Sequence, residues 1–191
     1  RCTRSSYQEV GGRLMTRSII THGALPSGSI LQVQRTRLTS ANTQALAQNT
    51  VVAITGMSVN ITPKFSNSLI RLDAHFFGEV GEEANTFNNM ISFMRDTTEL
   101  HETAVGTRNY GYGTLTRTIG STDAGTSPES GCIFDYDSPN TTSQVTYKLA
   151  IRVYSDGSGT DTLAINRVFS DGDYPYVEYG ISQISATEIA G

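Results

Sequence analysis

The chain has 191 residues, near the usual size of one domain, with 37% hydrophobic and only 17% charged residues. Its polar share therefore comes from Thr, Ser, Asn, Gln and Gly, which favours a β-protein, because Thr suits a pleated surface and Gly and Asn supply turns. A net charge of −4, from 14 basic and 18 acidic residues, argues against a nucleic-acid partner, since it provides no basic surface for a phosphate backbone.

Long apolar segments and cysteine patterns give no sign of a membrane span, a disulfide framework or a zinc site. The longest apolar runs, such as Val51 to Ile54, are far shorter than the roughly 18 to 20 residues of a membrane helix, so membrane insertion is not expected. Cys2 and Cys132 are too few for a disulfide framework and lack the spacing of zinc ligands. The first residues lack the apolar core of a signal peptide, and Met15 is a candidate natural start.

The N-terminal residues predict an arm followed by one domain. Residues 1–28 are irregular and basic, with Glu9 as their one acid, and we expect an arm that orders on a neighbouring molecule, followed by a single β-sandwich domain over residues 29–191. Leu31 and Val33 alternate with glutamines after the turn signal Pro-Ser-Gly, which predicts a half-buried strand. Residues 39–50 are small and polar and predict a connection with a short helical turn.

The next segments predict a bulged strand, a turn and a regular strand. Apolar residues before Gly56 share one parity and those after it share the other, as expected for a β-bulge. Residues 63–68, PKFSNS, have turn chemistry. Apolar and polar residues then alternate strictly from Ile70 to Phe76, which predicts a strand with one buried face.

The second half continues with short strands. Residues 85–100 fit both helical and strand spacing, and the neighbouring strands favour a strand. Residues 115–119 alternate, residues 120–131 predict a loop, and Cys132, Phe134 and Tyr136 then share one parity. Five alternating apolar residues over 145–153 predict the clearest inward-facing strand, and two more strands follow at residues 163–165 and at the C-terminus. The pattern of about eight or nine strands is typical of a sandwich, jelly roll or barrel.

No motif of catalysis stands out. His22, His75 and His101 lie far apart, and the sequence lacks a nucleophile elbow, a phosphate-binding loop and an H-E-x-x-H motif. Asp135 and Asp137 share one strand face about 7 Å apart, close to the spacing of a retaining glycosidase pair, but a solvated strand end is the favoured interpretation. We therefore expect no enzymatic activity, no catalytic residue and no cofactor.

Two further groups of residues concern binding. Residues 156–161 resemble a calcium loop in composition, and Asp171 and Asp173 offer more oxygens, but the order of acids favours a plain turn and no metal is expected. Tyrosine suits binding surfaces because it offers a large rigid ring with one polar tip. The candidate residues for contacts with a receptor or partner are Tyr110, Tyr112, Tyr174 and Tyr176. The alternative is that Tyr147, Tyr179 and Tyr110 pack in the core or between subunits.

Four motifs, in this order, resemble a family of small β-sandwich proteins and modules of bacteriophage virions. They are VVAITGMSVNITPKFSNSLIRL, FMRDTTEL, FDYDSPNTTSQVTYKLAIRVYS and the closing ISATEIAG, and the resemblance runs from about Ile30 to Gly191. In that family such domains are tail-fibre tips or other exposed virion components, including those of phages that infect marine bacteria and cyanobacteria, and they are usually trimeric or otherwise oligomeric. The motifs are structural and carry over no catalytic residue.

The resemblance implies an all-β, jelly-roll-like antiparallel sandwich located in the virion. Its role would be host attachment within a tail fibre or capsid decoration, with other virion proteins as partners, a homo-oligomer in which a trimer is favoured, and a host-surface glycan as a candidate ligand. The absence of a fibre shaft over these residues leaves tail and capsid both open. Two alternatives remain: a carbohydrate-binding module of non-viral origin and, more weakly, a glycan depolymerase that uses Asp135 and Asp137.

Overall fold

The computed structural model describes residues 25–81, 88–101, 106–115, 128–154, 161–170, 172–175 and 177–191. These residues form strands and contain no helix, so they include no helix that is long and apolar enough to cross a membrane. The 11 described strands are β1 (Ile30–Leu38), β2 (Asn42–Leu46), β3 (Val51–Ile61), β4 (Leu69–Val80), β5 (Asn88–Arg95), β6 (Thr98–Leu100), β7 (Gly113–Thr114), β8 (Glu129–Asp137), β9 (Val145–Tyr154), β10 (Asp161–Ile165) and β11 (Ser182–Ile189).

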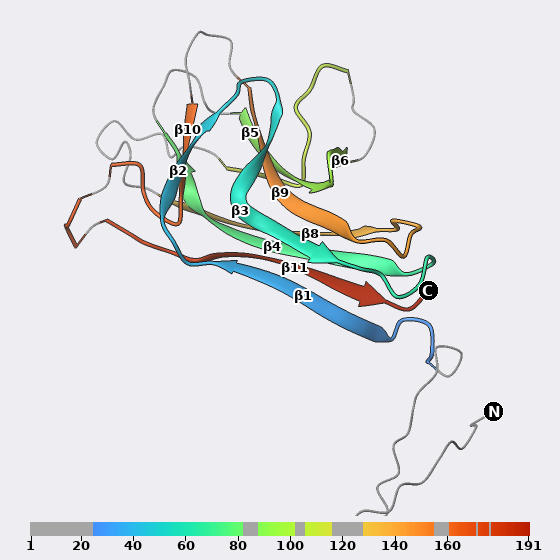
Figure 1. Cartoon of the computed structure of the whole chain (residues 1–191). Helices are drawn as coiled ribbons and strands as arrows, with labels where there is room; N and C mark the ends of the chain where they lie inside the picture. Colours follow the sequence, from blue (N-terminus) through green and yellow to red (C-terminus); the bar gives the residue numbers. More distant parts are fainter. Residues whose placement is uncertain are drawn as a thin grey trace, which may run out of the picture.

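The strands form two antiparallel sheets that pack face to face (Figure 1). The first sheet has the order β1-β11-β4-β10-β2, and β8 pairs with the other side of β4. The second sheet has the order β3-β9-β5-β6, with the two-residue β7 beside β5. The domain is thus a β-sandwich, as predicted.

Two pairs of strands in the first sheet act as single interrupted strands. β11 and β10 pair with successive parts of the same side of β4, over 69–75 and 78–80, while β1 pairs with β11 and β2 with β10. When β1 and β2 count as one strand, β10 and β11 count as another, and β7 is left out, eight strands remain. Numbered again from 1 to 8 in chain order, they follow the order 1-8-3-6 in the first sheet and 2-7-4-5 in the second. This interleaved order is that of a jelly roll, which confirms the predicted fold class.

The core lies between the two sheets. Alternate residues of β4, including Ile70, Leu72 and Phe76, are fully buried, and they face Tyr147, Leu149 and Ile151 of β9 across the sandwich. This is the inward parity that the sequence predicts for both strands, because successive side chains of a strand point to opposite faces. The ambiguous segment around β5 is a strand, with Ile91 and Phe93 in the core.

The predicted bulge in β3 is present at Gly56. Ala53 pairs with Ala150 and Ser58 with Lys148, so residues 54–57 of β3 lie opposite Leu149 alone. Gly56 has a φ of 80°, and a Cβ atom there would lie 2.9 Å from a methyl carbon of Leu38. The backbone conformation favours glycine at this position, and a Cβ atom would in addition displace the Leu38 methyl group.

Two predictions about the first 50 residues need correction. Residues 42–46 form β2, not a connection with a helical turn. Only Leu46 anchors this strand in the core, while the Gln44 side chain binds the backbone of Ala53 and Thr55, so the apolar alternation that reveals a strand is missing. β1 is a strand as predicted, but its Val33 side chain is 55% exposed. Its apolar parity faces outward.

The start of the described chain is tied to its end. Residues 26–29 form the predicted turn, in which the Ser29 N–H donates to the Pro26 carbonyl at 3.1 Å. The Gly28 N–H donates to the carbonyl of Ala190 at 2.8 Å. Residues 1–24 of the predicted arm lie outside the described residues, as do residues 116–119 of the predicted alternating run.

Candidate interaction surface

A buried carboxylate joins the end of β11 to the turn between β3 and β4. Glu188 is 0% exposed, and its Oε1 accepts hydrogen bonds from the Lys64 N–H at 2.6 Å and the Ser68 hydroxyl at 2.7 Å. Its Oε2 accepts one from the Gln32 amide at 2.6 Å. A buried charge requires such partners, because losing water without them is costly. The ITPKFSNS and ISATEIAG motifs therefore meet at this contact.

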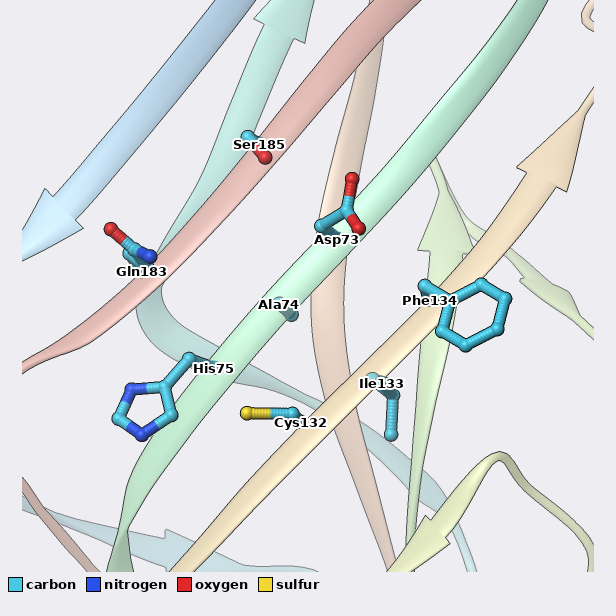
Figure 2. A pocket seen from close by; sticks show the side chains of 8 residues that line it. All are labelled: Asp73, Ala74, His75, Cys132, Ile133, Phe134, Gln183 and Ser185. Atoms are coloured by element: carbon cyan, nitrogen blue, oxygen red, sulfur yellow. The ribbon is translucent and has the colours of Figure 1, made fainter.

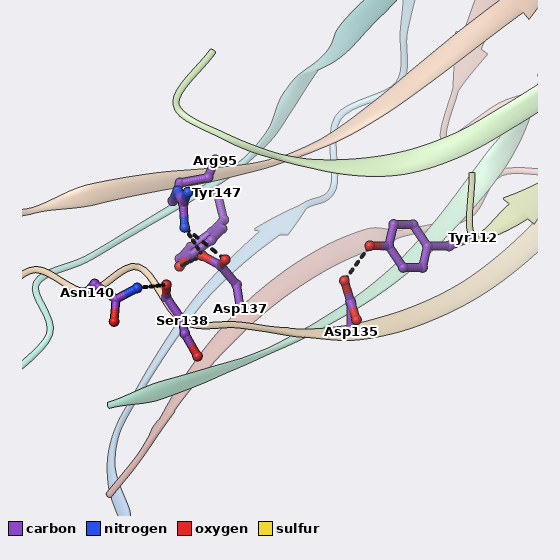
Figure 3. Close-up of polar contacts among 7 residues, drawn as sticks. All are labelled: Arg95, Tyr112, Asp135, Asp137, Ser138, Asn140 and Tyr147. Carbon is purple, nitrogen blue, oxygen red and sulfur yellow. Dashed lines mark hydrogen bonds and ion pairs between the residues drawn. The ribbon is translucent and has the colours of Figure 1, made fainter. Parts of the chain in front are cut away.

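A second polar contact joins β5, β8 and β9 (Figure 3). Arg95 of β5 donates to both carboxylate oxygens of Asp137 at 2.8 Å, and the Tyr147 hydroxyl donates to Asp137 at 2.6 Å. Burial raises the pKa of Tyr147 well above its usual value, and the hydrogen bond to Asp137 raises it further. This contact brings the FMRDTTEL and FDYDSPNTTSQVTYKL motifs together.

The carboxylates of Asp135 and Asp137 are both bound within the fold. Asp135 accepts a hydrogen bond from the hydroxyl of Tyr112, whereas Asp137 is held by Arg95 and Tyr147 (Figure 3). The side chain of Asp137 is only 12% exposed, so the interpretation as a solvated strand end is wrong for this residue. The two carboxylates therefore have different partners within the fold.

The predicted tyrosine contacts fall into separate environments. The Tyr110 ring lies 4.3 Å from the His101 ring and 4.8 Å beneath the guanidinium of Arg152. Tyr112 is half-buried and packs 5.6 Å from Phe93, measured between ring centroids. These two rings are thus largely used by contacts within the chain.

The other tyrosines are placed differently. Tyr174 is 58% exposed in the segment between β10 and β11, and Tyr176 lies outside the described residues. Tyr147 packs in the core, as the alternative interpretation expects, whereas Tyr179 is 58% exposed. The described structure therefore places one of the four candidate residues, Tyr174, on an open surface.

A regular surface is formed by the outer face of β1, β11, β4 and β8, which we call the four-strand face. The strand register aligns its side chains in three rows across the sheet. From β1 to β8 these rows are Val33, Thr187, Arg71 and Tyr136; Arg35, Ser185, Asp73 and Phe134; and Arg37, Gln183, His75 and Cys132. Figure 2 shows side chains of these rows, among them Asp73, Phe134 and Gln183, on one side of the sheet.

Large apolar side chains are exposed on this face. Phe134 is 65% exposed, Tyr136 is 47% exposed and Val33 is 55% exposed, and Ile30 at the start of β1 is 66% exposed. The outer face of the second sheet instead presents polar side chains, among them Ser58, Asn60, Thr146 and Lys148. These residues form two groups at the borders of the face, one on β1 and one on β8, and exposed apolar groups on one sheet face are typical of interaction sites.

The polar side chains of the four-strand face are ordered by contacts within the face. Arg71 and Asp73 form an ion pair at 2.8 Å. The His75 ring is held from both sides, since Nδ1 lies 3.0 Å from the Ile181 carbonyl oxygen and Nε2 lies 2.7 Å from the Ser130 hydroxyl. With three arginines and one aspartate in its rows, the face carries two net positive charges.

A shallow hollow of about 240 Å³ lies on the same face (Figure 2). Its lining includes Asp73, His75, Cys132, Phe134 and Gln183. Ligand pockets usually enclose about 300 to 1,000 Å³, so this open hollow is better suited to side chains of another macromolecule than to an enclosed small molecule. Among the residues that the structure describes, no group of three or more His, Cys, Asp or Glu is arranged to hold a metal ion.

The chain matches no family model and no curated protein in these comparisons. The site must therefore be judged from its own geometry.

Sequence patterns did not single out the residues that define this surface, namely Val33, Phe134 and Tyr136. A signal for them was nonetheless present. Phe134 and Tyr136 have the opposite parity to Ile133, which is buried, and they alternate with acids. A strand whose aromatic residues and whose buried aliphatic residue point to opposite faces presents the aromatic residues to solvent or to a partner.

Proposed function

We propose that this chain is a structural protein of a bacteriophage virion, an exposed component that acts through assembly and surface display. The observation that carries the proposal is the way in which the motifs of the resemblance are used. Glu188 and Asp137, both within those motifs, join distant segments of a jelly roll. The motif residues thus specify a fold that is common among viral capsid and lectin domains.

The four-strand face supports a homo-oligomer. Exposed Phe134, Tyr136 and Val33 on one regular sheet face are typical of a surface that is covered in an assembly. The polar and Thr-rich remainder of the chain suits wet contacts with other virion proteins, since bridging water satisfies polar groups at little cost. A trimer is the favoured form because of the resemblance, and the role is host attachment in a tail fibre or capsid decoration.

A carbohydrate-binding module is the second candidate. Jelly rolls also serve as lectin domains, and exposed rings such as Phe134, Tyr136 and Tyr174 offer flat surfaces on which sugars stack. For the depolymerase alternative the support is weaker, because Asp135 and Asp137 are occupied by Tyr112, Arg95 and Tyr147.

Imaging of virions tests the leading proposal. An antibody raised against the purified chain is applied to phage particles from a culture that expresses it, and electron microscopy locates the label. Label at regular positions on the capsid or the tail supports the proposal and decides between the two sites. A chain that is abundant in the lysate but absent from purified particles would overturn it, and glycan-array binding by a monomeric chain would then favour the carbohydrate-binding module.

A further inference from the structure

We propose that the four-strand face is the contact between copies of this chain, with β1 of one copy packed against β8 of a second copy. The inference deepens the proposed function, since it rests on the homo-oligomer proposed there and names the surface that forms it. The outward residues of β1, namely Val33, Arg35 and Arg37, are called the β1 column. Those of β8, namely Cys132, Phe134 and Tyr136, are called the β8 column.

Each column includes apolar side chains that face outward next to polar side chains that face inward. On β8 the acids Asp135 and Asp137 face their partners within the sandwich, while Phe134 and Tyr136 face outward. On β1, Gln32 reaches inward to the buried carboxylate of Glu188 while Val33 is exposed.

Strand β4, which lies between them, has the ordinary alternation. On β4, Ile70 and Leu72 are buried and Arg71 and Asp73 lie on the outer face.

On β1 the inversion of this alternation is limited to Gln32 and Val33, because Arg35 and Arg37 lie outward and Leu38 packs against the core. Burial of polar groups in this sheet is sustained by dedicated hydrogen bonds, as at Glu188 of β11. Such an arrangement is expected where the outward apolar residues have a partner of their own.

The chemistry of the two columns indicates that unlike columns pack together. Two β1 columns facing each other would place Arg35 and Arg37 against their own copies, which charge repulsion opposes. The β8 column instead offers the rings of Phe134 and Tyr136, and an arginine over such a ring gains a cation–π interaction.

A carboxylate adds to this complementarity. Asp73 is the direct neighbour of Phe134 in the same row, and both of its bonds from Arg71 use the single oxygen Oδ1. An incoming arginine therefore meets a ring and a carboxylate together, while Val33 packs on Tyr136. The β1 column, which is aliphatic and cationic, thus complements the β8 column and the neighbouring Asp73 of a second copy.

The dimensions are adequate for a specific contact. Four strands at about 4.8 Å and nine residues at about 3.3 Å give a face of roughly 20 by 30 Å, or about 600 Å², against about 800 Å² per partner in a standard interface. Side-chain relief adds to the flat area, so two copies packed face to face would bury most of one such interface, whereas in a trimer each copy divides this face between two neighbours. On the outer face of the second sheet, over the part of the chain that the structure describes, Met90 and Met94 are half-buried and no large apolar side chain is exposed to the extent of Phe134.

Mass in solution is the first test. The full chain at micromolar concentration is expected to run as an oligomer in native mass spectrometry and light scattering. The variant F134D/Y136D is expected to run as a monomer, with association weakened by roughly 100-fold or more, because a few large aromatic side chains often carry most of the affinity of a contact. Ser58→Asp on the second sheet and Tyr174→Asp on the exposed segment are matched controls that should retain the wild-type mass, and circular dichroism confirms that each variant is folded.

Engineered cysteines test which columns meet. The β1 and β8 columns lie three strand spacings apart, about 14 Å, so cysteines at 33 and 136 are too far apart for a disulfide within one copy. In a background with Cys2 and Cys132 replaced by Ser, V33C/Y136C is expected to form disulfide-linked oligomers on mild oxidation. V33C alone and Y136C alone should remain unlinked.

The outcomes separate the inference from the proposed function. An F134D/Y136D chain that keeps the wild-type oligomer mass would overturn the inference and leave the homo-oligomer intact. Crosslinking by V33C alone as efficiently as by the double variant would refute the pairing of unlike columns. A wild-type chain that is monomeric at micromolar concentration would refute both the inference and the homo-oligomer, whereas localisation on the virion is decided independently by imaging.

Discussion

Replacing Glu188 by Ala tests whether the joined motifs stabilise the fold. Three short hydrogen bonds, at 2.6, 2.7 and 2.6 Å, reach this fully buried carboxylate. A hydrogen bond to a charged group contributes about 1.5 to 3 kcal/mol, and a buried donor left without a partner costs about 1 to 3 kcal/mol. Allowing for water entering the vacated space, we expect a loss of about 4 kcal/mol. Glu188→Gln keeps one oxygen towards the turn and should lose about 2 kcal/mol.

Urea and thermal unfolding measure these losses. For a chain of this size each kcal/mol shifts the melting temperature by about 2 to 4 °C, so Glu188→Ala should lower it by roughly 8 to 16 °C. All variants are compared at one protein concentration, because association raises apparent stability. Glu178→Ala, at an exposed position, is the control and should stay within about 0.5 kcal/mol of wild type. A loss below about 1 kcal/mol for Glu188→Ala would refute the reasoning.

Two further stability predictions follow from single residues. The pKa of Tyr147 is raised in the folded state, so its contribution to stability is fully present below the unfolded pKa of about 10 and is lost as pH rises further, by at most about 1.4 kcal/mol per pH unit. Urea unfolding between pH 9 and 11 should show a shallower decline for Tyr147→Phe than for wild type or Tyr174→Phe; equal slopes would contradict this cause. Gly56→Ala should cost about 2 kcal/mol, since it combines a φ of 80° with a contact 2.9 Å from Leu38, whereas Gly106→Ala, with a φ of 66° and open space, should cost about 1 kcal/mol. Similar losses for both glycines in thermal unfolding would exclude the Leu38 contact as a cause.

Strict alternation made the central strands predictable from the sequence. β4 and β9 carry apolar residues at every second position and lie in the core as expected, and the phase change at Gly56 located the bulge. β2 was missed because Leu46 is its one buried apolar residue. Alternation separates the two faces of a strand but does not show which face is buried. For β1 the buried face is set by the hydrogen bond between Gln32 and Glu188, which lie 156 positions apart in the sequence.

The candidate surface was less predictable for the same physical reason. Phe134 and Tyr136 belong to a motif whose acids, Asp135 and Asp137, bind partners that lie 10 to 42 positions away along the chain. Only the folded arrangement shows that the acids are engaged and the rings are left outward. Tyrosine composition pointed instead to Tyr110 and Tyr112, whose rings are largely used within the chain.

Strand β8 shows how one short motif can serve both fold and assembly. Its inward Asp137 joins β8 to β5 and β9 through Arg95 and Tyr147, and its inward Asp135 binds Tyr112, so these acids fix the position of the strand relative to the second sheet. Because side chains alternate, fixing the acids inward also fixes Phe134 and Tyr136 outward, on a sheet face rather than on a mobile loop. A rigid aromatic surface loses little conformational entropy on binding, which favours association. The same residues that stabilise the jelly roll therefore prepare the face through which, on the present proposal, copies of the chain assemble.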